Sequence, residues 1–208
     1  MSINKREELE KLKKEMQGDN SLPLRAGATQ LVFGEGNPNT KVYFIGEGPG
    51  FNEDRLGRPF VGQAGKLLDN LLQSVNLKRE DVYISNIVRF RPPENRDPLP
   101  EEIEAFRPYV DREIEIIDPK IIVTLGRFSM GKFLPNVKIS QVHGKPRKIS
   151  WHGREMVIIP MYHPAAALRA GAIMQQIRED FKIIPEVIKG LEEENKKEDN
   201  SGEQMKLL

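Results

Sequence analysis

The most informative stretch of this chain is Lys41-Val42-Tyr43-Phe44-Ile45-Gly46-Glu47-Gly48-Pro49-Gly50, in which an apolar run enters a turn rich in glycine and proline. The apolar run has the pattern of a buried strand, and open α/β sheets bind ligands at the carboxyl ends of such strands. Glycine in the turn lets a ligand approach the main chain closely. We therefore expect a ligand site here, with Gly46 and Gly48 against the ligand and Glu47 as its charged group.

Strands alternate with helices along the rest of the chain. Apolar runs predict strands at residues 41–45, 81–87, 121–125 and 156–159, the last of them preceded by a hairpin partner at 149–151. Apolar residues at helical spacing predict helices at residues 4–16, 64–75, 101–117, 128–133 and 173–191. This alternation is typical of a parallel sheet covered on both faces. The predicted fold class is α/β, a three-layer α/β/α sandwich with a central, mostly parallel four-stranded sheet.

Composition limits the class of protein. The chain has 208 residues, and 32 Lys and Arg against 31 Asp and Glu give a net charge of +1, without the global signature of a nucleic-acid binder. We expect a single domain over residues 1–190, beginning with a helix and loop over 1–30, and a charged, disordered tail over 191–208. No apolar run approaches the roughly 18 residues of a membrane span, and the N-terminus lacks a signal-peptide core. We predict a cytoplasmic monomer without a membrane partner, and the charged fraction of 30% favours a thermophilic source.

Cysteine is absent from the sequence. This absence excludes disulfides, thiolate nucleophiles, cysteine-ligated zinc and cysteine-ligated iron–sulfur clusters. The chain has three histidines, His143, His152 and His163, but their spacing does not suit a three-histidine metal site. We therefore predict no metal ligands.

Three turns at predicted strand ends carry chemically useful side chains. Glu47 and Phe60 follow the first strand, Asn86 lies at the end of the second, and His163 follows the last. Because the carboxyl ends of parallel strands meet at one edge of a sheet, we expect these residues to converge on one crevice. Each has a plain structural alternative: a glutamate can bond loop amides, an aromatic ring or histidine can pack in a core, and an asparagine can shape a turn.

Seven segments together resemble the uracil-DNA glycosylase superfamily, most closely the thermostable group often called family 4. The resemblance runs from about residue 32 to residue 182, and the matching segments keep the family's order. They are VFGEGNP (32–38), GEGPG (46–50), GRPFVGQAG (57–65), SNIV (85–88), RPP (91–93), VTLG (123–126) and HPAA (163–166). A GEGPG segment alone would be weak evidence for this family, whereas several matching segments in register are specific to it.

The resemblance implies an enzyme of DNA repair that flips uracil out of DNA and hydrolyses its N-glycosidic bond with water as nucleophile. It makes Glu47 and His163 catalytic, and it makes Gly46, Gly48, Phe60 and Asn86 part of the base pocket. The residue types suit these roles. An aromatic ring can stack on a flipped base, and an amide can bond the N3 hydrogen and O4 of uracil together. The histidine can stabilise the departing uracil at O2, and the glutamate can position water or stabilise the sugar cation.

The resemblance also implies a local surface for DNA. The segment after His163 resembles a loop that enters the minor groove, and Leu168 is the expected apolar wedge, although Ala167 stands where related enzymes place theirs. Positive side chains near the predicted pocket are expected to contact phosphates. The DNA-binding residues predicted in this way are Arg89, Arg91, Lys145, Leu168 and Arg169.

Members of this group typically hold an iron–sulfur cluster through four cysteines. The corresponding positions in this chain lie near Asp19 and Leu22 and at Phe90 and Phe106. The cluster cannot be built from these residues, so we predict an enzyme without a cofactor, in which ring packing replaces the inorganic cross-link.

Other functions remain open at this point. The same fold can act on deaminated purines such as hypoxanthine, or serve as a DNA module that recognises lesions without cutting. A nucleotide enzyme with a phosphate loop is a further alternative, but no Gly-Lys-Ser/Thr follows the glycine-rich turn. The tail, which ends at Leu208, faintly resembles a peptide that binds a sliding clamp but lacks the paired aromatic residues.

Overall fold

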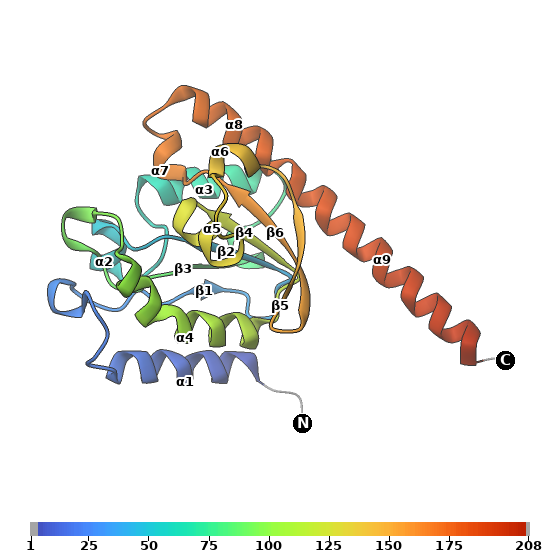
Figure 1. Cartoon of the computed structure of the whole chain (residues 1–208), viewed down its shortest axis with the longest axis horizontal. Helices are drawn as coiled ribbons and strands as arrows, with labels where there is room; N and C mark the ends of the chain where they lie inside the picture. Colours follow the sequence, from blue (N-terminus) through green and yellow to red (C-terminus); the bar gives the residue numbers. More distant parts are fainter. Residues whose placement is uncertain (1–3, 207–208) are drawn as a thin grey trace.

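Six strands form one sheet at the centre of the computed structural model, which describes residues 4–206 (Figure 1). Their order across the sheet is β1-β3-β2-β4-β6-β5. The strands are β1 (Glu35–Gly36), β2 (Val42–Gly46), β3 (Tyr83–Asn86), β4 (Ile121–Leu125), β5 (Arg147–Trp151) and β6 (Arg154–Met161).

The four central strands are parallel, and a short antiparallel strand extends the sheet at each edge. β2 pairs with β3 and with β4, and β4 pairs with β6, all in parallel. The predicted sandwich with a parallel four-stranded centre is therefore confirmed, within a larger sheet. β1 has two residues, too few to show a periodicity, and β5 is the predicted hairpin partner, which pairs with β6 along its whole length.

Helices connect the strands. Each of the five predicted helices has a counterpart, and the last one is divided in two. The α-helices are α1 (Lys5–Gly18), α2 (Phe51–Leu56), α3 (Gln63–Ser74), α4 (Pro100–Ile117), α5 (Arg127–Phe133), α6 (Ile139–Val142), α7 (Pro164–Ala167), α8 (Gly171–Phe181) and α9 (Ile183–Lys206). Short 3₁₀ helices are η1 (Arg25–Gly27), η2 (Arg79–Asp81) and η3 (Pro93–Asn95).

The sheet divides the apolar core into two layers. Tyr43 and Ile45 of β2 pack with buried residues of α1 and α4, whereas Val42 and Phe44 pack with buried residues of α3 and α8. Successive side chains of a strand point to opposite faces, so a fully apolar strand requires a cover on both sides. Figure 1 shows α1 and α4 on one side of the sheet and α3 and α8 on the other.

The C-terminal segment differs from the prediction made from composition. Helix α9 begins after Lys182, carries Pro185 in its first turn and continues to Lys206, across residues for which we predicted disorder. Proline is tolerated in a first turn because the N–H that it lacks has no helical partner there. The Glu and Lys that indicate a solvated tail also favour helix formation. Figure 1 shows α9 extending away from the sheet, and Leu207 and Leu208, the end of the possible clamp peptide, lie outside the described residues.

The positions that correspond to the cluster cysteines lie in or beside the apolar layer between α1 and α4. Phe90 and Phe106 are 2% and 0% exposed, and their ring centroids lie 6.1 Å apart at 56°. Leu22 belongs to the same buried cluster, and the Tyr109 hydroxyl donates to Asp19 Oδ2 at 2.7 Å. These residues do not fit an iron–sulfur cluster, because they offer no thiolate and their rings pack against each other. Each ring contributes about 2 to 3 kcal/mol on burial.

No helix within residues 4–206 is both long enough and apolar enough to cross a membrane.

Candidate active site

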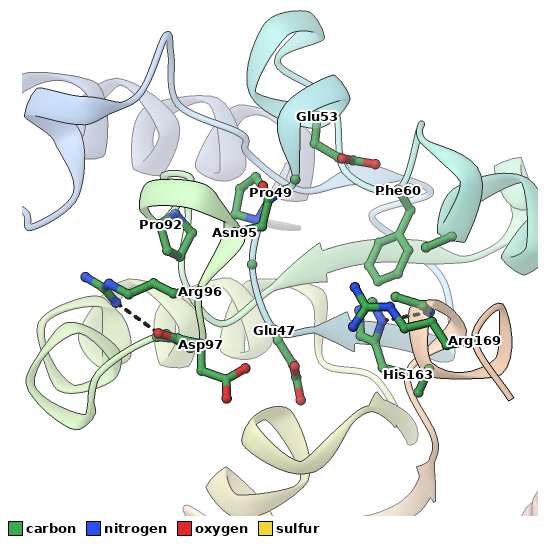
Figure 2. Close-up of a pocket in the computed structure, with 16 residues that line it drawn as sticks. Glu47, Pro49, Glu53, Phe60, Pro92, Asn95, Arg96, Asp97, His163 and Arg169 are labelled. Carbon is green, nitrogen blue, oxygen red and sulfur yellow. Dashed lines mark hydrogen bonds between the residues drawn. The ribbon is translucent and has the colours of Figure 1, made fainter. Parts of the chain in front are cut away.

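A cavity of about 450 Å³ opens at the carboxyl ends of the parallel strands. Glu47, Phe60 and His163 line it, together with Gly48 and Arg169. Its opposite wall is the proline-rich loop over residues 92–98. Figure 2 shows Phe60 and His163 on one side, Glu47 between the walls, and Arg96 with Asp97 on the other side. The structure therefore brings Glu47 and Phe60, which follow the first predicted strand, and His163, which follows the last, to one cavity.

Gly46, the last residue of β2, is where two of the predicted pocket residues meet. A Cβ at this position would lie 2.5 Å from Asn86 Oδ1 and 2.5 Å from Phe60 Cζ. Such distances are too short for any side chain, so glycine is required for the amide and the ring to approach each other. The parallel register, in which Gly46 lies opposite Asn86, delivers the amide to this point. Gly46 and Asn86 are both buried, and neither of these two residues lines the cavity directly.

Asn86 carries an unusual buried polar atom. The residue is 2% exposed, and its Oδ1 has no hydrogen-bond partner among the described residues. Buried carbonyl oxygens without a partner are uncommon, because each costs the free energy of its lost hydration. The Asn86 Oδ1 is therefore available as a hydrogen-bond acceptor for a ligand.

Glu47 follows directly after β2, and its carboxylate lies against the start of α5. The Phe128 backbone N–H donates to Glu47 Oε1 at 3.1 Å. Gly126 has a φ of +103°, which side chains rarely adopt, and a Cβ there would lie 2.2 Å from the same oxygen. Both the backbone conformation and the lack of space therefore require glycine at this position. Burial is the main cause that raises the pKa of Glu47 above its usual value. The Phe128 N–H counteracts this rise, and the charge of Asp97 adds to it.

His163 stands before α7 and caps it. Its Nδ1 accepts a hydrogen bond from the Ala165 N–H at 3.1 Å. A ring nitrogen that accepts carries no proton, so the proton of the neutral imidazole resides on Nε2. Burial lowers the pKa of His163 to about 4, which keeps the ring neutral near pH 7. The ring stacks on Phe60 with centroids 5.6 Å apart and an interplanar angle of 27°.

Two of the predicted DNA contacts lie at the rim of this cavity. Leu168 is 48% exposed, whereas its neighbour Ala167 is 3% exposed and belongs to the core. The apolar side chain available to solvent is therefore Leu168. Arg169 is exposed and lines the cavity, and Figure 2 shows it beside His163.

Arg91 and Lys145 lie farther from the base pocket. Arg91 donates to Asn95 Oδ1 at 2.7 Å, and its guanidinium lies 5.2 Å from the centroid of the Phe51 ring, which is 58% exposed. Lys145 is exposed and donates to the Gln141 carbonyl at 2.9 Å. Both charges are available to a polyanion.

The prediction that Arg89 contacts DNA is wrong. The residue is 0% exposed and pairs with Glu113 of α4 at 2.6 Å, so it cannot reach a DNA phosphate. Glu113 also accepts from the Tyr43 hydroxyl at 2.5 Å. The pair ties β2 and the end of β3 to α4. A lone arginine after a strand gave no sign of this burial, because its partner lies 24 residues away in sequence.

Glu53 is a site residue to which the sequence analysis gave no role. It lies in the first turn of α2 and lines the cavity, and its Oε1 accepts from the Val61 and Gly62 N–H groups at 2.9 and 2.7 Å. A signal was present, since an acid three residues after the glycine-rich turn falls at a helix start beside the expected ligand. Among residues 4–206, no group of three His, Asp or Glu side chains could hold a metal ion.

The side chains around the cavity suit a flat polar ring. Phe60 offers an apolar face, Asn86 a free acceptor, and His163 a neutral N–H donor, while Glu47 adds one carboxylate. A ligand that fits would be a heteroaromatic ring with an N–H to donate and carbonyl oxygens to accept.

Comparison with known proteins gives a consistent result. Residues 33–182 match the family described as the uracil DNA glycosylase superfamily. Three similar proteins are named type-4 uracil-DNA glycosylase. The one from Saccharolobus solfataricus is 47% identical over 163 residues, which cover 76% of each chain. The one from Sulfurisphaera tokodaii is 45% identical over 185 residues, covering 86% of this chain and 84% of the relative. The one from Archaeoglobus fulgidus is 42% identical over 187 residues, covering 87% and 94%.

Proposed function

The chain belongs to the uracil-DNA glycosylase superfamily, and we propose that it removes uracil from DNA by hydrolysing the N-glycosidic bond, which leaves an abasic site. The observation that carries the proposal is the buried Asn86 Oδ1, which has no partner among the described residues and lies against Gly46 with the Phe60 ring. A base cannot be reached inside a duplex, so the substrate must be a flipped nucleotide.

Recognition of uracil rests on the Asn86 amide. Its free Oδ1 accepts the N3 hydrogen of uracil, and its amide nitrogen donates to O4. Cytosine has no hydrogen on N3 and presents an amino group in place of O4, so it would leave both amide atoms without partners. A pocket built on such hydrogen bonds rejects the wrong ring more strongly than an apolar pocket does. Phe60 supplies the stacking face.

Departure of the base is assigned to His163. When the bond between C1′ and N1 breaks, its electron pair leaves with uracil, and negative charge develops on O2. The Nε2 proton, fixed by the Ala165 contact on Nδ1, donates to that oxygen. Because the ring is already neutral, this stabilisation requires no protonated imidazole.

The water that replaces the base is assigned to Glu47. The sugar carries positive charge in the transition state, and a nearby carboxylate stabilises it. The raised pKa of Glu47 makes the ionised carboxylate a better acceptor for the proton that water loses as its oxygen bonds C1′. No lysine forms a covalent intermediate in this scheme. Leu168 fills the gap left by the flipped base, and Arg91, Lys145 and Arg169 contact phosphates, so DNA is the partner.

The function is tested with an oligonucleotide that contains one uracil, incubated with the purified chain and a metal chelator and then treated with alkali. We expect strand breaks at uracil only after alkali. Asn86→Ala should lose the activity, whereas Asn70→Ala, an exposed asparagine of α3, should keep it.

Other outcomes of this assay would reject the assignment. Breaks without alkali would indicate a lyase. Equal cleavage of an oligonucleotide with hypoxanthine would favour the broader glycosylase, and DNA binding without breaks would favour a module that only recognises lesions. Persistent activity in Asn86→Ala would reject the pocket.

A further inference from the structure

Phe60 holds its ring at the cavity with a backbone conformation that side chains rarely adopt. Its φ is +51°, in the left-handed region. For a bulky residue this conformation is unfavourable and persists only where the surroundings impose it. The turn over residues 59–62, here called the Phe60 turn, must therefore be held by contacts from outside.

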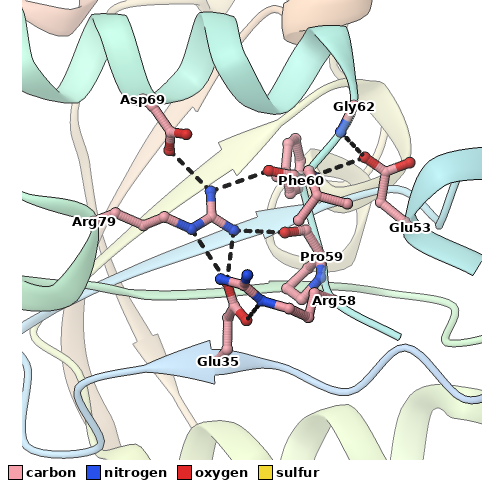
Figure 3. A network of polar contacts seen from close by, with 9 residues as sticks. Glu35, Glu53, Arg58, Pro59, Phe60, Gly62, Asp69 and Arg79 are labelled. Atoms are coloured by element: carbon pink, nitrogen blue, oxygen red, sulfur yellow. Dashed lines mark hydrogen bonds and ion pairs between the residues drawn. The ribbon is translucent and has the colours of Figure 1, made fainter. Parts of the chain in front are cut away.

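Two side chains of opposite charge hold four backbone groups in succession along the Phe60 turn. Arg79 donates to the Pro59 carbonyl at 2.5 Å and to the Phe60 carbonyl at 3.1 Å. Glu53 Oε1 accepts from the Val61 and Gly62 N–H groups at 2.9 and 2.7 Å. Figure 3 shows Arg79 and Glu53 reaching the turn from opposite sides. Both peptide groups that flank Phe60 are thereby held by at least one of these side chains.

Arg79 is itself held in place from two directions. Its guanidinium contacts Glu35 of β1 at 2.8 Å and Asp69 of α3 at 2.9 Å, and the side chain is 22% exposed. It lies in η2, just before β3, and does not line the cavity. The planar fork of arginine can serve two carboxylates and two carbonyls at once, which a lysine ammonium cannot. Arg79 therefore makes more contacts than an ion pair that serves stability alone would require.

We propose that Arg79 is a positioning residue for uracil excision, acting through the backbone of Phe60. It fixes the left-handed turn, and the turn holds the ring against His163 and beside the Asn86 amide. This inference rests on the proposed function, because the ring matters only if a base stacks on it. Arg79 does not line the cavity and belongs to none of the segments that carry the family resemblance.

Arg58 provides a matched control. It pairs with the same Glu35, at 2.7 Å, but is 60% exposed and makes no hydrogen bond to the Phe60 turn. Arg58→Gln therefore removes an arginine from the same carboxylate and leaves the turn untouched. A role of Arg79 in stability alone predicts that the two variants differ only in how far they lower the melting temperature.

The test compares Arg79→Gln with Arg58→Gln in single-turnover excision of uracil, well below the melting temperature of each variant. We expect Arg79→Gln to slow excision about 10- to 100-fold, since a displacement of about 1 Å can cost about 100-fold. Arg58→Gln should change the rate less than about twofold. In a Phe60→Ala background, Arg79→Gln should have no further effect, because the ring through which it acts is absent.

A second readout does not require activity. Hydrogen exchange at the Val61 and Gly62 amides should be faster in Arg79→Gln than in Arg58→Gln, because release of the carbonyls loosens the turn that Glu53 holds. If Arg79→Gln does not fold, Arg79→Lys replaces it, since lysine keeps the charge but cannot span both carbonyls.

Three results would overturn the inference: equal rates in the Arg79 and Arg58 variants, an undiminished Arg79 effect in the Phe60→Ala background, or unchanged exchange at the two amides. If the unaltered chain excises no uracil, the proposed function fails instead. The exchange measurement then still decides whether Arg79 holds the turn.

Discussion

Phe60 and Phe106 are both buried in apolar clusters, at 4% and 0% exposed, but of the two only Phe60 has its backbone turn bound by charged side chains. Phe60 has a left-handed backbone fixed by charged side chains, whereas Phe106 lies in helix α4 and packs on Phe90 and other apolar residues. In the proposed function a base stacks on one face of the Phe60 ring, so apolar packing alone cannot hold the ring. A ring that serves stability can be surrounded on all sides, and packing then suffices.

The first prediction tests the stability side of this contrast. Phe106→Ala should lower the free energy of unfolding by about 3 to 5 kcal/mol, because it opens a cavity where Phe90 now packs. Denaturant titration measures this loss. The rate of uracil excision per folded molecule should stay near that of the unaltered chain, since neither Phe90 nor Phe106 lines the cavity.

Val137→Ala, at a position 40% exposed, serves as the control and should change stability by less than about 0.5 kcal/mol. A Phe106→Ala protein that is folded but inactive would show that the two regions are coupled, and the contrast between them would then fail.

The second prediction tests the ligand side. His163→Ala should slow excision about 100- to 1,000-fold, the usual cost of removing a hydrogen-bond donor to a developing anion. The stability loss should be smaller than for Phe106→Ala, because the contacts removed are one cap to the Ala165 N–H and one stacked ring. Single-turnover rates and melting curves measure the two effects.

His152→Ala is the matched control, since this histidine of the β5–β6 hairpin is 51% exposed and pairs with Glu115 of α4. An equal loss of activity in both variants would remove His163 from the mechanism. A large loss of stability in His163→Ala would place it with Phe106 as a packing residue.

The contrast also explains how much of the molecule the sequence could predict. Phe106 lies in α4, a helix that hydrophobic periodicity predicted, whereas Phe90 lies in the loop after β3 and belongs to no predicted element. Glu47, Asn86 and His163 stand at the ends of parallel strands, so topology alone placed them at one edge of the sheet. Local pattern and strand order therefore gave the layers and the position of the cavity.

Contacts between distant charged side chains could not be predicted in this way. Arg79 meets Glu35, which lies 44 residues earlier, and Arg89 meets Glu113, which lies 24 residues later. A charged residue in a sequence usually predicts a side chain exposed to solvent. Only the folded structure shows which charged side chains are buried. The support of the Phe60 turn and the burial of Arg89 both depend on such long-range pairs, and sequence reasoning missed both.

The smallest predicted effect on stability concerns Glu47, whose ionised carboxylate should lower the stability of the fold. Its pKa is raised in the folded chain, chiefly by burial, so folding disfavours the ionised form. Relative to the protonated form, this cost is absent below the pKa of the unfolded chain and is present once the pH exceeds the raised folded value. Glu47→Gln should therefore raise the melting temperature slightly at pH 7 to 8, and the gain should vanish toward the ordinary glutamate pKa of about 4.3.

The same substitution should abolish most of the excision activity, because a neutral amide cannot accept the proton of water or balance a sugar cation. The Gln oxygen can still accept from the Phe128 N–H, so the change isolates the charge. His163 titrates near pH 4 and stays neutral at higher pH, which leaves Glu47 as the group whose protonation limits activity on the acid side. Melting curves and excision rates from pH 4 to 8 test both parts. If Glu47→Gln were less stable than the unaltered chain at pH 8, the carboxylate would stabilise the fold, as Phe106 does. It would then not be a group that serves the ligand and lowers the stability of the fold.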